Sequence, residues 1–377
     1  MRKSMVLGII VCLLLAVGPP RVQAQIREAP SGIAEEQREE QQQAQIREEP
    51  SGIAEERKEE KEAAQKEPRE AKPVELGGAL LPNWRLVIEP FFEYDHISGQ
   101  NVALSGFTIF ESILIGTINI TKLRRDIFIP GVNFRLGAFG SELMLKVPYL
   151  IRSDQNMYGG TGQLSGRTIE KDLSDSGIGD LELYWYYPLI KEGTWRRWVP
   201  DTIIRLGGYF PTGRDPYHLN RQDIAGLGLI PVQFPTGTGA FGTSGGVTFI
   251  KSADPAVLFL NLVYYYNFES HVGLAGSPPI NFGNIKIGNT FEYSVGLIFA
   301  LQERLSMNFS LDQKITGKTQ QNGSRLADTQ LDAIQFNIGA TYMVSPRYTV
   351  DMVVAIGCSR DAPDVSAWVR VPISFQF

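Results

Sequence analysis

Apolar and polar residues alternate one by one along much of the chain. The last residues show this most clearly, with one set on each side of an extended backbone: Val369, Val371, Ile373, Phe375 and Phe377 against Arg370, Pro372, Ser374 and Gln376. Successive side chains of a strand point to opposite faces, so this pattern predicts a two-faced strand. Its apolar face points either at a protein core or at lipid, and the pattern in the rest of the sequence distinguishes these two possibilities.

The same alternation recurs in segments of about ten residues, the length that a tilted strand needs to cross a bilayer. Such segments lie at 142–151, 180–187, 257–268, 305–312, 334–342 and 348–356. Short connections alternate with longer polar loops. The short connections lie near 253–255, 302–304 and 345–347, and the longer loops near 152–176, 213–236, 269–285 and 317–330. Transmembrane barrels have short turns at one rim and long loops at the other, whereas a soluble β-sandwich needs no such asymmetry. The chain is therefore predicted to be all-β, a transmembrane antiparallel β-barrel.

Aromatic residues give a second indication. Tyr and Trp gather toward strand ends at 184–187 and 264–266, where a membrane interface holds amphipathic rings, although rings packed in a core are the alternative. A final aromatic residue on an alternating strand resembles the signal that the barrel assembly machinery of the bacterial outer membrane recognises. We therefore expect Phe375 and Phe377 to form an assembly signal, with Phe377 facing lipid near the periplasmic rim.

The number of strands follows from parity. Both ends of the barrel domain are expected in the periplasm, which requires an even number. Nine clear strands can be traced from Glu142 onward, so residues 84–138 must supply an odd number, most simply three. The prediction is about 12 strands, and 10 or 14 are also compatible with the pattern. The last strand must pair with the first, near 84–94, because a closed barrel leaves no free edge in lipid.

The start of the chain predicts export. Arg2 and Lys3 precede an apolar run from Met5 to Val17, and VQA at 22–24 offers small residues for cleavage. This predicts a signal peptide over 1–24, with a retained membrane anchor as the alternative. The mature chain would keep a single cysteine, Cys358, which cannot form an internal disulfide.

Residues 25–75 form a charged arm built on a tandem repeat: AQIREAPSGIAEEQREEQQQ at 24–43 nearly recurs at 44–63. The arm holds nine Lys or Arg against fifteen Glu and no aromatic residue. It cannot bury enough apolar surface to fold alone, so we expect a disordered or partly helical periplasmic arm. A coiled-coil stalk is the alternative, with few apolar positions to support it. The barrel is assigned to 76–377.

The middle of the chain resembles a known family. The stretches that carry the likeness are GIGDLELYWYYPL at 177–189, GGYFPTGRDPY at 207–217 and PTGTGAFGTSGGVTFIKSADPAVLFLNLVYYYNF at 235–268. They resemble the outer-membrane transporter family labelled "MetA-pathway of phenol degradation". The resemblance covers roughly residues 84–377 and leaves out the arm. It implies a small outer-membrane barrel that passes hydrophobic or aromatic compounds, although fold transfers between relatives better than substrate does.

Ten charged residues fall on the strand faces opposite the apolar ones and are the candidate lumen-lining residues: Glu142, Lys146, Asp180, Glu182, Arg205, Glu292, Asp312, Lys314, Asp351 and Arg370. A charge on the lipid face costs about 2–4 kcal/mol near the midplane, so the interior is the place for them. They either pair across a filled barrel or line a narrow wet path whose mixed signs tune selectivity.

No catalytic motif emerges. The three histidines, His96, His218 and His271, are scattered over predicted loops, and no acidic residues are spaced around them as in a metal site. GTGAFG at 237–242 opens a strand rather than a helix, so phosphate binding is not expected. PTG at 211–213 and again at 235–237 predicts turns at the two ends of one outer loop. We expect no enzyme activity, no metal and no cofactor.

The leading hypothesis is a bacterial outer-membrane channel for passive uptake of small hydrophobic or aromatic solutes. Its expected partners are outer-membrane lipid, the assembly machinery and the solute. The near-neutral barrel has no basic stripe, so nucleic acid is not expected. One alternative is a structural barrel whose acidic arm tethers a periplasmic partner. Another is an outer-membrane hydrolase, for which the chain offers no recognisable nucleophile.

Overall fold

The computed structural model describes residues 80–98, 102–103, 108–109, 120–159, 168–194, 196, 198–224, 228–327 and 329–376. These residues belong to one compact unit, Pro68–Phe377. The predicted signal peptide, the repeated arm at 25–75 and Phe377 lie outside the described residues. Within the described part of the chain, no helix is long and apolar enough to cross a membrane.

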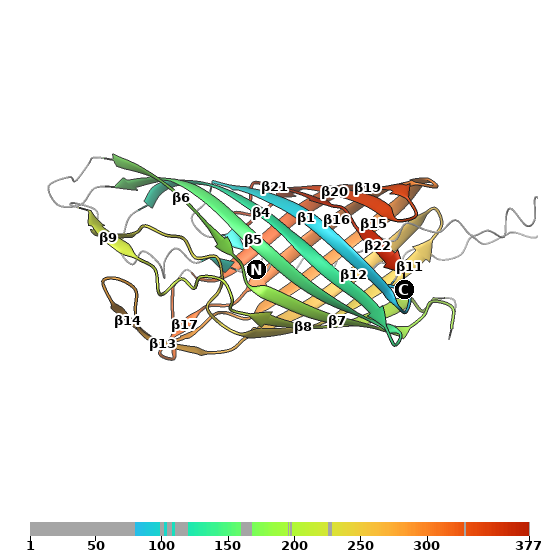
Figure 1. The fold of residues 1–377 in the computed structure, drawn as a ribbon, viewed down its shortest axis with the longest axis horizontal. Coiled ribbons are helices and arrows are strands. Elements are labelled where there is room, and N and C mark those ends of the chain that lie inside the picture. The colour runs from blue at the N-terminus through green and yellow to red at the C-terminus, as the bar shows by residue number, and fades with distance from the viewer. Residues whose placement is uncertain are drawn as a thin grey trace, which may run out of the picture. The chain divides into compact units, whose positions relative to one another are not determined.

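Within the described residues, a closed antiparallel barrel of 12 strands makes up most of the structure (Figure 1). Two of the strands are interrupted, so each consists of two labelled pieces. In chain order the barrel strands are β1 (Arg85–Ile97), β4 (Ile120–Ala138), β5 (Ser141–Gly159), β6 (Thr168–Ile178) with β7 (Leu181–Ile190), β8 (Asp201–Phe210), β11 (Gly242–Ala253), β12 (Ala256–Asn267), β15 (Thr290–Gln302), β16 (Leu305–Thr316), β19 (Leu331–Ser345), β20 (Tyr348–Gly357), and β21 (Val365–Arg370) with β22 (Ile373–Gln376).

The first and last strands close the barrel, as the sequence predicted. Phe91 pairs with Arg370 through β21, and Leu86 pairs with Phe375 through β22. The predicted total of about 12 strands is confirmed, but its division was wrong. Residues 84–138 supply only β1 and β4 to the barrel, because β4 is a single strand of 19 residues. The segment from Ser141 onward supplies the rest.

One end of the barrel carries short turns. Phe139 and Gly140 join β4 to β5 with φ values of 52° and 71°, the two positive angles that a type I′ hairpin requires. Equally short connections join β11 to β12, β15 to β16, and β19 to β20. The start of β1 and the end of β22 lie at this same end, since Arg85 pairs both with Gly137, next to the β4–β5 turn, and with Gln376. We call it the short-turn end.

The other end, on the left in Figure 1, carries long connections with small strands of their own. These are β2 (Val102–Ala103) with β3 (Thr108–Ile109), β9 (Arg221–Ile224) with β10 (Gly228–Pro231), β13 (Ser270–Ala275) with β14 (Ile280–Lys286), and β17 (Gln320–Gln321) with β18 (Ser324–Arg325). The loop expected at 152–176 is mostly strand instead, because β5 runs to Gly159 and β6 begins at Thr168. Polar residues there continue the ladder beyond the length that a bilayer requires.

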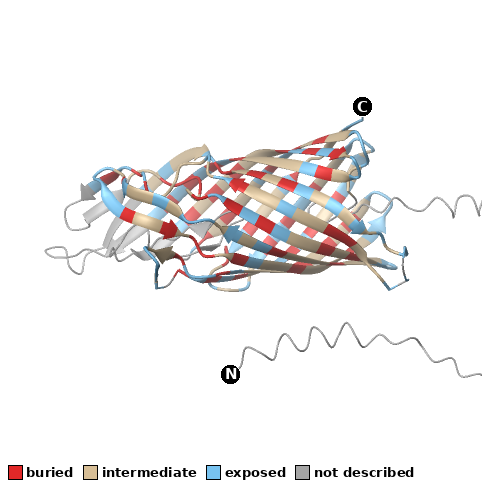
Figure 2. Ribbon diagram, turned by 90° about the horizontal axis from the view of Figure 1, so that it is seen from below, coloured by how far each residue is buried: buried red, intermediate tan, exposed pale blue. Residues whose placement is uncertain are grey.

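Burial alternates along the barrel strands, as Figure 2 shows in the checkered pattern of buried and exposed residues. In β20, Met352, Val354 and Ile356 are about half exposed on the outer face, while Val353 and Ala355 are buried. Charged and hydroxyl side chains occupy the buried, inward positions of the neighbouring strands. An apolar exterior around a polar interior is the arrangement that a lipid-spanning barrel needs.

Candidate functional site

A chamber of about 250 Å³ lies within the barrel lumen. The structure places eight of the ten candidate lumen residues in its lining: Lys146, Glu182, Arg205, Glu292, Asp312, Lys314, Asp351 and Arg370. The other two, Glu142 and Asp180, are buried elsewhere and hold chain segments in place, as shown below. The chamber wall is therefore polar and carries both signs of charge.

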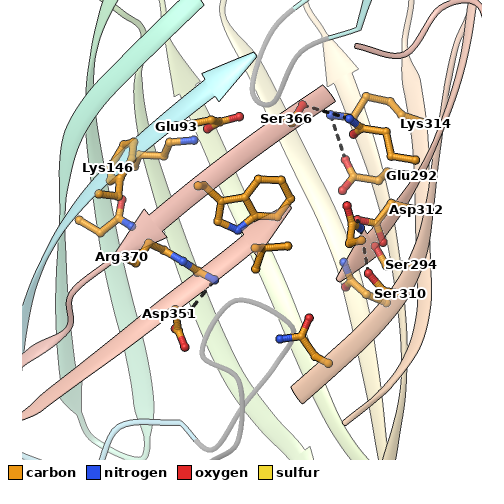
Figure 3. A pocket seen from close by; sticks show the side chains of 18 of the residues that line it. Glu93, Lys146, Glu292, Ser294, Ser310, Asp312, Lys314, Asp351, Ser366 and Arg370 are labelled. Atoms are coloured by element: carbon orange, nitrogen blue, oxygen red, sulfur yellow. Dashed lines mark hydrogen bonds and ion pairs between the residues drawn. The ribbon is translucent and has the colours of Figure 1, made fainter. Parts of the chain in front are cut away.

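Most of the chamber's charges are arranged in pairs from neighbouring strands. Lys146 Nζ lies 3.6 Å from Glu182 Oε1, and these residues stand directly opposite each other in the ladder between β5 and β7. Lys314 Nζ lies 3.4 Å from Glu292 Oε2, again directly across β15 and β16. Figure 3 shows this second pair on one wall and Arg370 beside Asp351 on another. Cross-strand register thus sets which charges meet.

Arg205 differs from the other three cations of the chamber wall. Among the described residues it has no carboxylate partner, whereas Lys146, Lys314 and Arg370 each have one. Its Nη2 donates to the Tyr265 hydroxyl at 2.9 Å. Its guanidinium carbon lies 4.7 Å from the centre of the Tyr184 ring and 5.6 Å from that of Tyr265. Arg205 is held by aromatic rings instead of by an acid.

The tyrosines around Arg205 come from β7, β8 and β12. Tyr186 of β7 stands opposite Arg205 in the ladder. The Tyr184 ring lies over Gly207 of β8, where a Cβ atom would come within 2.8 Å of it. Tyr209 packs edge-on against Tyr184, with ring centres 5.9 Å apart. Glycine at 207 therefore lets the Tyr184 ring lie close to the wall beside the arginine.

At the short-turn end, the segment before β1 enters the lumen. Leu80 packs against a cluster of inward side chains from β8, β11, β12 and β15, namely Ile203, Ile250, Phe259 and Ile298. On the opposite wall, Gly137 leaves room for the segment, since a Cβ atom there would lie 2.3 Å from the Pro82 carbonyl oxygen. We call residues 80–84 the strap. Together with the cluster it forms an apolar floor beneath the chamber, next to Tyr186.

Glu142 holds the strap. The Leu81 backbone N–H donates to Glu142 Oε2 at 3.0 Å, and Arg135 Nε donates to Oε1 at 2.6 Å. The network continues through Glu89, which lies 3.6 Å from Arg135 and accepts a hydrogen bond from Asn133 at 2.9 Å. Glu142 was a candidate lumen residue that was expected either to pair within the barrel or to line a path. It points inward but anchors chain instead, because both of its oxygens are occupied.

At the long-loop end, the connection between β8 and β11 folds over the lumen. Leu219, fully buried, packs against inward residues of β1, β4 and β5: Phe91, Ile97, Ile127, Ile129 and Leu150. Burial raises the pKa of the neighbouring Tyr217 hydroxyl above its ordinary value, in keeping with a dry contact against Phe282. Since Phe91 also lines the chamber, this cluster caps it from above.

Asp180 ties the two ends of this loop, residues 211–241, to the break between β6 and β7. It accepts hydrogen bonds from Gly213 N at 3.0 Å, Thr238 N at 2.7 Å and Thr238 Oγ1 at 2.8 Å. The two PTG motifs stand at the ends of the loop, as the sequence predicted, and touch each other through Gly213 and Gly237. Asp180 is thus an anchor of the loop and lies outside the chamber lining.

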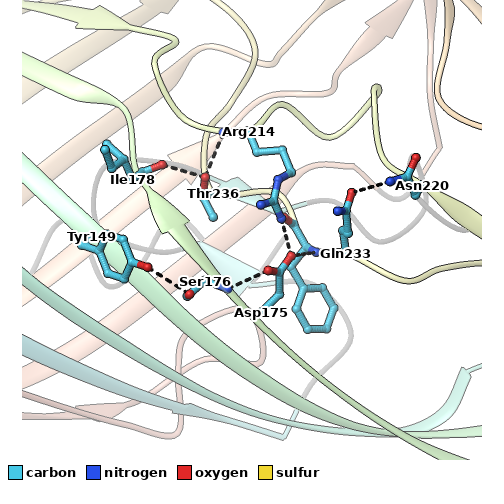
Figure 4. Close-up of polar contacts among 9 residues, drawn as sticks. Tyr149, Asp175, Ser176, Ile178, Arg214, Asn220, Gln233 and Thr236 are labelled. Carbon is cyan, nitrogen blue, oxygen red and sulfur yellow. Dashed lines mark hydrogen bonds and ion pairs between the residues drawn. The ribbon is translucent and has the colours of Figure 1, made fainter.

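Asp175 of β6 provides a second anchor (Figure 4). It pairs with Arg214 and accepts a hydrogen bond from the Phe234 backbone N–H at 2.9 Å. Thr236 donates to the Ile178 carbonyl oxygen at 2.7 Å and accepts from Arg214 N at 2.9 Å. These bonds join residues far apart in the sequence, so they hold the loop ends against the barrel wall.

Releasing this loop should enlarge ion flow through the barrel. In Asp180→Ala the loop loses three hydrogen bonds to a charged group, each contributing about 1.5–3 kcal/mol. We expect a higher single-channel conductance in planar bilayers than that of the unmodified protein. Asp172→Ala is the matched control, because Asp172 is an exposed carboxylate of β6. Equal conductance of Asp180→Ala and the control would contradict the anchoring role.

The histidines contribute little to the lumen. His96 lies in β1 and bonds to Asp126 at 2.8 Å, which corrects its expected place in a loop. His218 pairs with Asp215 in the loop over the lumen, and His271 lies in β13. Within the described residues, no group of three or more His, Cys, Asp or Glu side chains is arranged to hold a metal ion.

Comparison with solved structures supports the fold. The chain is similar to the COG4313 outer membrane channel from Pseudomonas putida F1, with 14% identity, 81% of this chain and 100% of that chain covered, and a TM-score of 0.51. The chain therefore has the fold of an outer-membrane channel. This agrees with the transporter barrel that the sequence resemblance implied. No family model matches the sequence.

Two further structures show weaker likeness. They are the translocator domain of autotransporter NalP from Neisseria meningitidis and a FadL homologue from Pseudomonas aeruginosa. The first has 10% identity, covers 79% of this chain and 90% of that chain, and has a TM-score of 0.40. The second has 9% identity, covers 80% and 96%, and has a TM-score of 0.39. Neither adds to the fold assignment.

Several residues that line the chamber were not among the predicted lumen residues. Glu93 and Asp95 of β1 line the chamber, as do Trp368 and the tyrosines beside Arg205. The signal was present in the alternation, since Tyr184 and Tyr186 share the face of Glu182 and Tyr209 shares that of Arg205. It was overlooked because tyrosines near strand ends were interpreted as membrane-interface residues.

Proposed function

We propose that this protein is a channel of the bacterial outer membrane that admits small solutes through the central chamber. The observation that carries the proposal is a polar chamber with charges of both signs, enclosed in a barrel whose outer face is apolar. The short-turn end, with the strap, would face the periplasm, and the long-loop end would face outward. The repeated arm would then lie on the periplasmic side.

The chamber suggests which solutes pass. Its volume of about 250 Å³ lies below the roughly 300–1,000 Å³ of pockets that hold drug-sized ligands, so one small ring or a comparable solute would fit. Phe91, Tyr184, Tyr186, Tyr265 and Trp368 offer aromatic surface. The charged wall would disfavour a wholly apolar solute, because such a solute cannot replace the hydrogen bonds of the water that it displaces. Solutes that combine an aromatic ring with a polar group suit both features.

Liposome swelling tests the proposal directly. Liposomes that contain the purified protein should admit polar aromatic solutes of the size of benzyl alcohol faster than protein-free liposomes do. They should exclude large oligosaccharides. Asp180→Ala, with its loosened loop, should speed entry of every small solute. If neither the unmodified protein nor this variant admits any solute faster than empty vesicles, the channel function is wrong.

A further inference from the structure

We infer that Arg205 and its tyrosines form a binding site for a small aromatic carboxylate inside the chamber. The inference rests on the proposed function, because the solute would reach the site through the channel. It names the chemical class of that solute. The carboxylate would bind the arginine, and the ring would lie against Tyr184 and Tyr265.

The first step of the argument is the state of Arg205 itself. An arginine inside a protein is normally held by an acid, because its charge is costly to bury alone. Arg205 Nε is buried and has no hydrogen-bond partner among the described residues. Its Nη2 donates only to a neutral hydroxyl, that of Tyr265. A carboxylate arriving from the chamber would supply the charged acceptor that Arg205 lacks among the described residues.

The second step concerns the acids on the same wall. Glu182 and Glu292 face the same chamber as Arg205. Each is already engaged by a lysine of the adjacent strand, Lys146 at 3.6 Å and Lys314 at 3.4 Å. The Arg205 guanidinium thus keeps donor capacity at its Nε, which these acids do not take up. Its planar fork matches the two oxygens of a carboxylate.

The third step is the shape of the wall next to the guanidinium. Gly246 of β11 stands directly opposite Arg205, and Gly207 lies two residues further along β8. Because neither carries a side chain, Tyr184 packs closely over Gly207 and Val263 over Gly246. The Tyr184 ring, 4.7 Å from the guanidinium carbon, provides a face for stacking. An arginine that lines the chamber beside aromatic rings is suited to a planar anion that carries its own ring.

Binding of benzoate to the detergent-solubilised full barrel, measured by isothermal titration calorimetry, tests the inference. Benzyl alcohol offers the ring without the charge, and acetate offers the charge without the ring. We expect benzoate to bind more tightly than either. Arg205→Gln should weaken benzoate by about tenfold or more, the loss of a charge-assisted hydrogen bond, and leave benzyl alcohol nearly unchanged.

Three further variants sharpen the test. Arg205→Lys keeps the positive charge but loses the planar guanidinium, so it should retain a reduced preference for benzoate over benzyl alcohol. This variant replaces Arg205→Gln in the test if Arg205→Gln does not fold. Arg370→Gln removes a chamber arginine that already has Asp351, and should weaken benzoate less than Arg205→Gln does. Arg347→Gln, in the exposed turn after β19, should match the unmodified protein.

The outcomes separate this inference from the channel function. Benzoate affinity that is unchanged in Arg205→Gln, or lowered equally in Arg370→Gln, overturns the site. So does an Arg205→Lys protein that binds benzoate no better than benzyl alcohol. Solute entry into liposomes without benzoate binding would leave the channel standing and remove the site. Benzoate binding without entry of any solute would support the site and overturn the channel.

Discussion

Asp154→Ala should destabilise the barrel by about 3–5 kcal/mol, because it removes the carboxylate shared by two buried arginines. Arg125 Nε and Nη2 donate to Asp154 at 2.8–3.0 Å, and Arg152 Nε donates at 2.8 Å. The side chains of Arg125 and Asp154 are 1% exposed and that of Arg152 is 4% exposed. Water cannot replace the lost charge at that depth.

The measurement is the urea dependence of unfolding from lipid vesicles, followed by the electrophoretic shift between folded and unfolded forms. Asp172→Ala is the control, an exposed carboxylate on the neighbouring strand β6 that should shift the midpoint little. Asp154→Asn, which keeps the shape and loses the charge, should fall between the two. If Asp154→Ala and Asp172→Ala unfold at the same urea concentration, the triad does not stabilise the barrel.

The same variant should disturb the loop above the chamber. The Arg152 guanidinium carbon lies 4.0 Å from the centre of the Phe234 ring, which belongs to the 211–241 loop. Without Asp154 the arginine loses the partner that orients it toward this ring. The triad therefore couples the stability of β4 and β5 to the position of the loop that covers the lumen.

Val354→Arg should lower the stability of the membrane-inserted barrel by about 2–4 kcal/mol, the effect of an arginine on the lipid face near the bilayer midplane. Val354 is 49% exposed on the outer face of β20 and lies between Ile338 of β19 and Ala367 of β21. Its neighbours on that face are apolar, so the guanidinium has no protein partner there. The charge must either deform the lipid or keep the strand out of the membrane.

Tyr348→Arg is the matched control for this prediction. Tyr348 is on the same face of the same strand and is 46% exposed, but it stands at the short turn, where the membrane interface lies. An arginine at the interface should lower stability by about 0–1 kcal/mol. Folding into vesicles at increasing urea gives both values. Equal loss in the two variants would mean that β20 does not run through the bilayer as the barrel requires.

Much of the fold was predictable because face assignment is a local property. Side chains along a strand alternate between the two faces with a period of two. The inward position of the buried Arg370, next to the exposed Val369, can therefore be recognised from a few neighbouring residues. The same rule predicted the two-faced strands, the inward charges and the asymmetry between short turns and long loops. It could not predict where a long strand such as β4 begins, because the first residues of Ile120–Ala138 are mostly polar.

The sequence by itself determined the barrel class, the apolar exterior and the inward-facing charges, because each depends on residues close together in the chain. Only the tertiary structure decided which charges meet and what fills the lumen. Arg205 reaches Tyr265, Glu142 holds Leu81, and Asp180 holds Thr238 through contacts between strands and loops that are far apart in sequence. Such contacts depend on strand order, register and inward loop folding, which no local pattern specifies. The chamber and the arginine that tyrosines hold in its wall exist only because those distant segments come together.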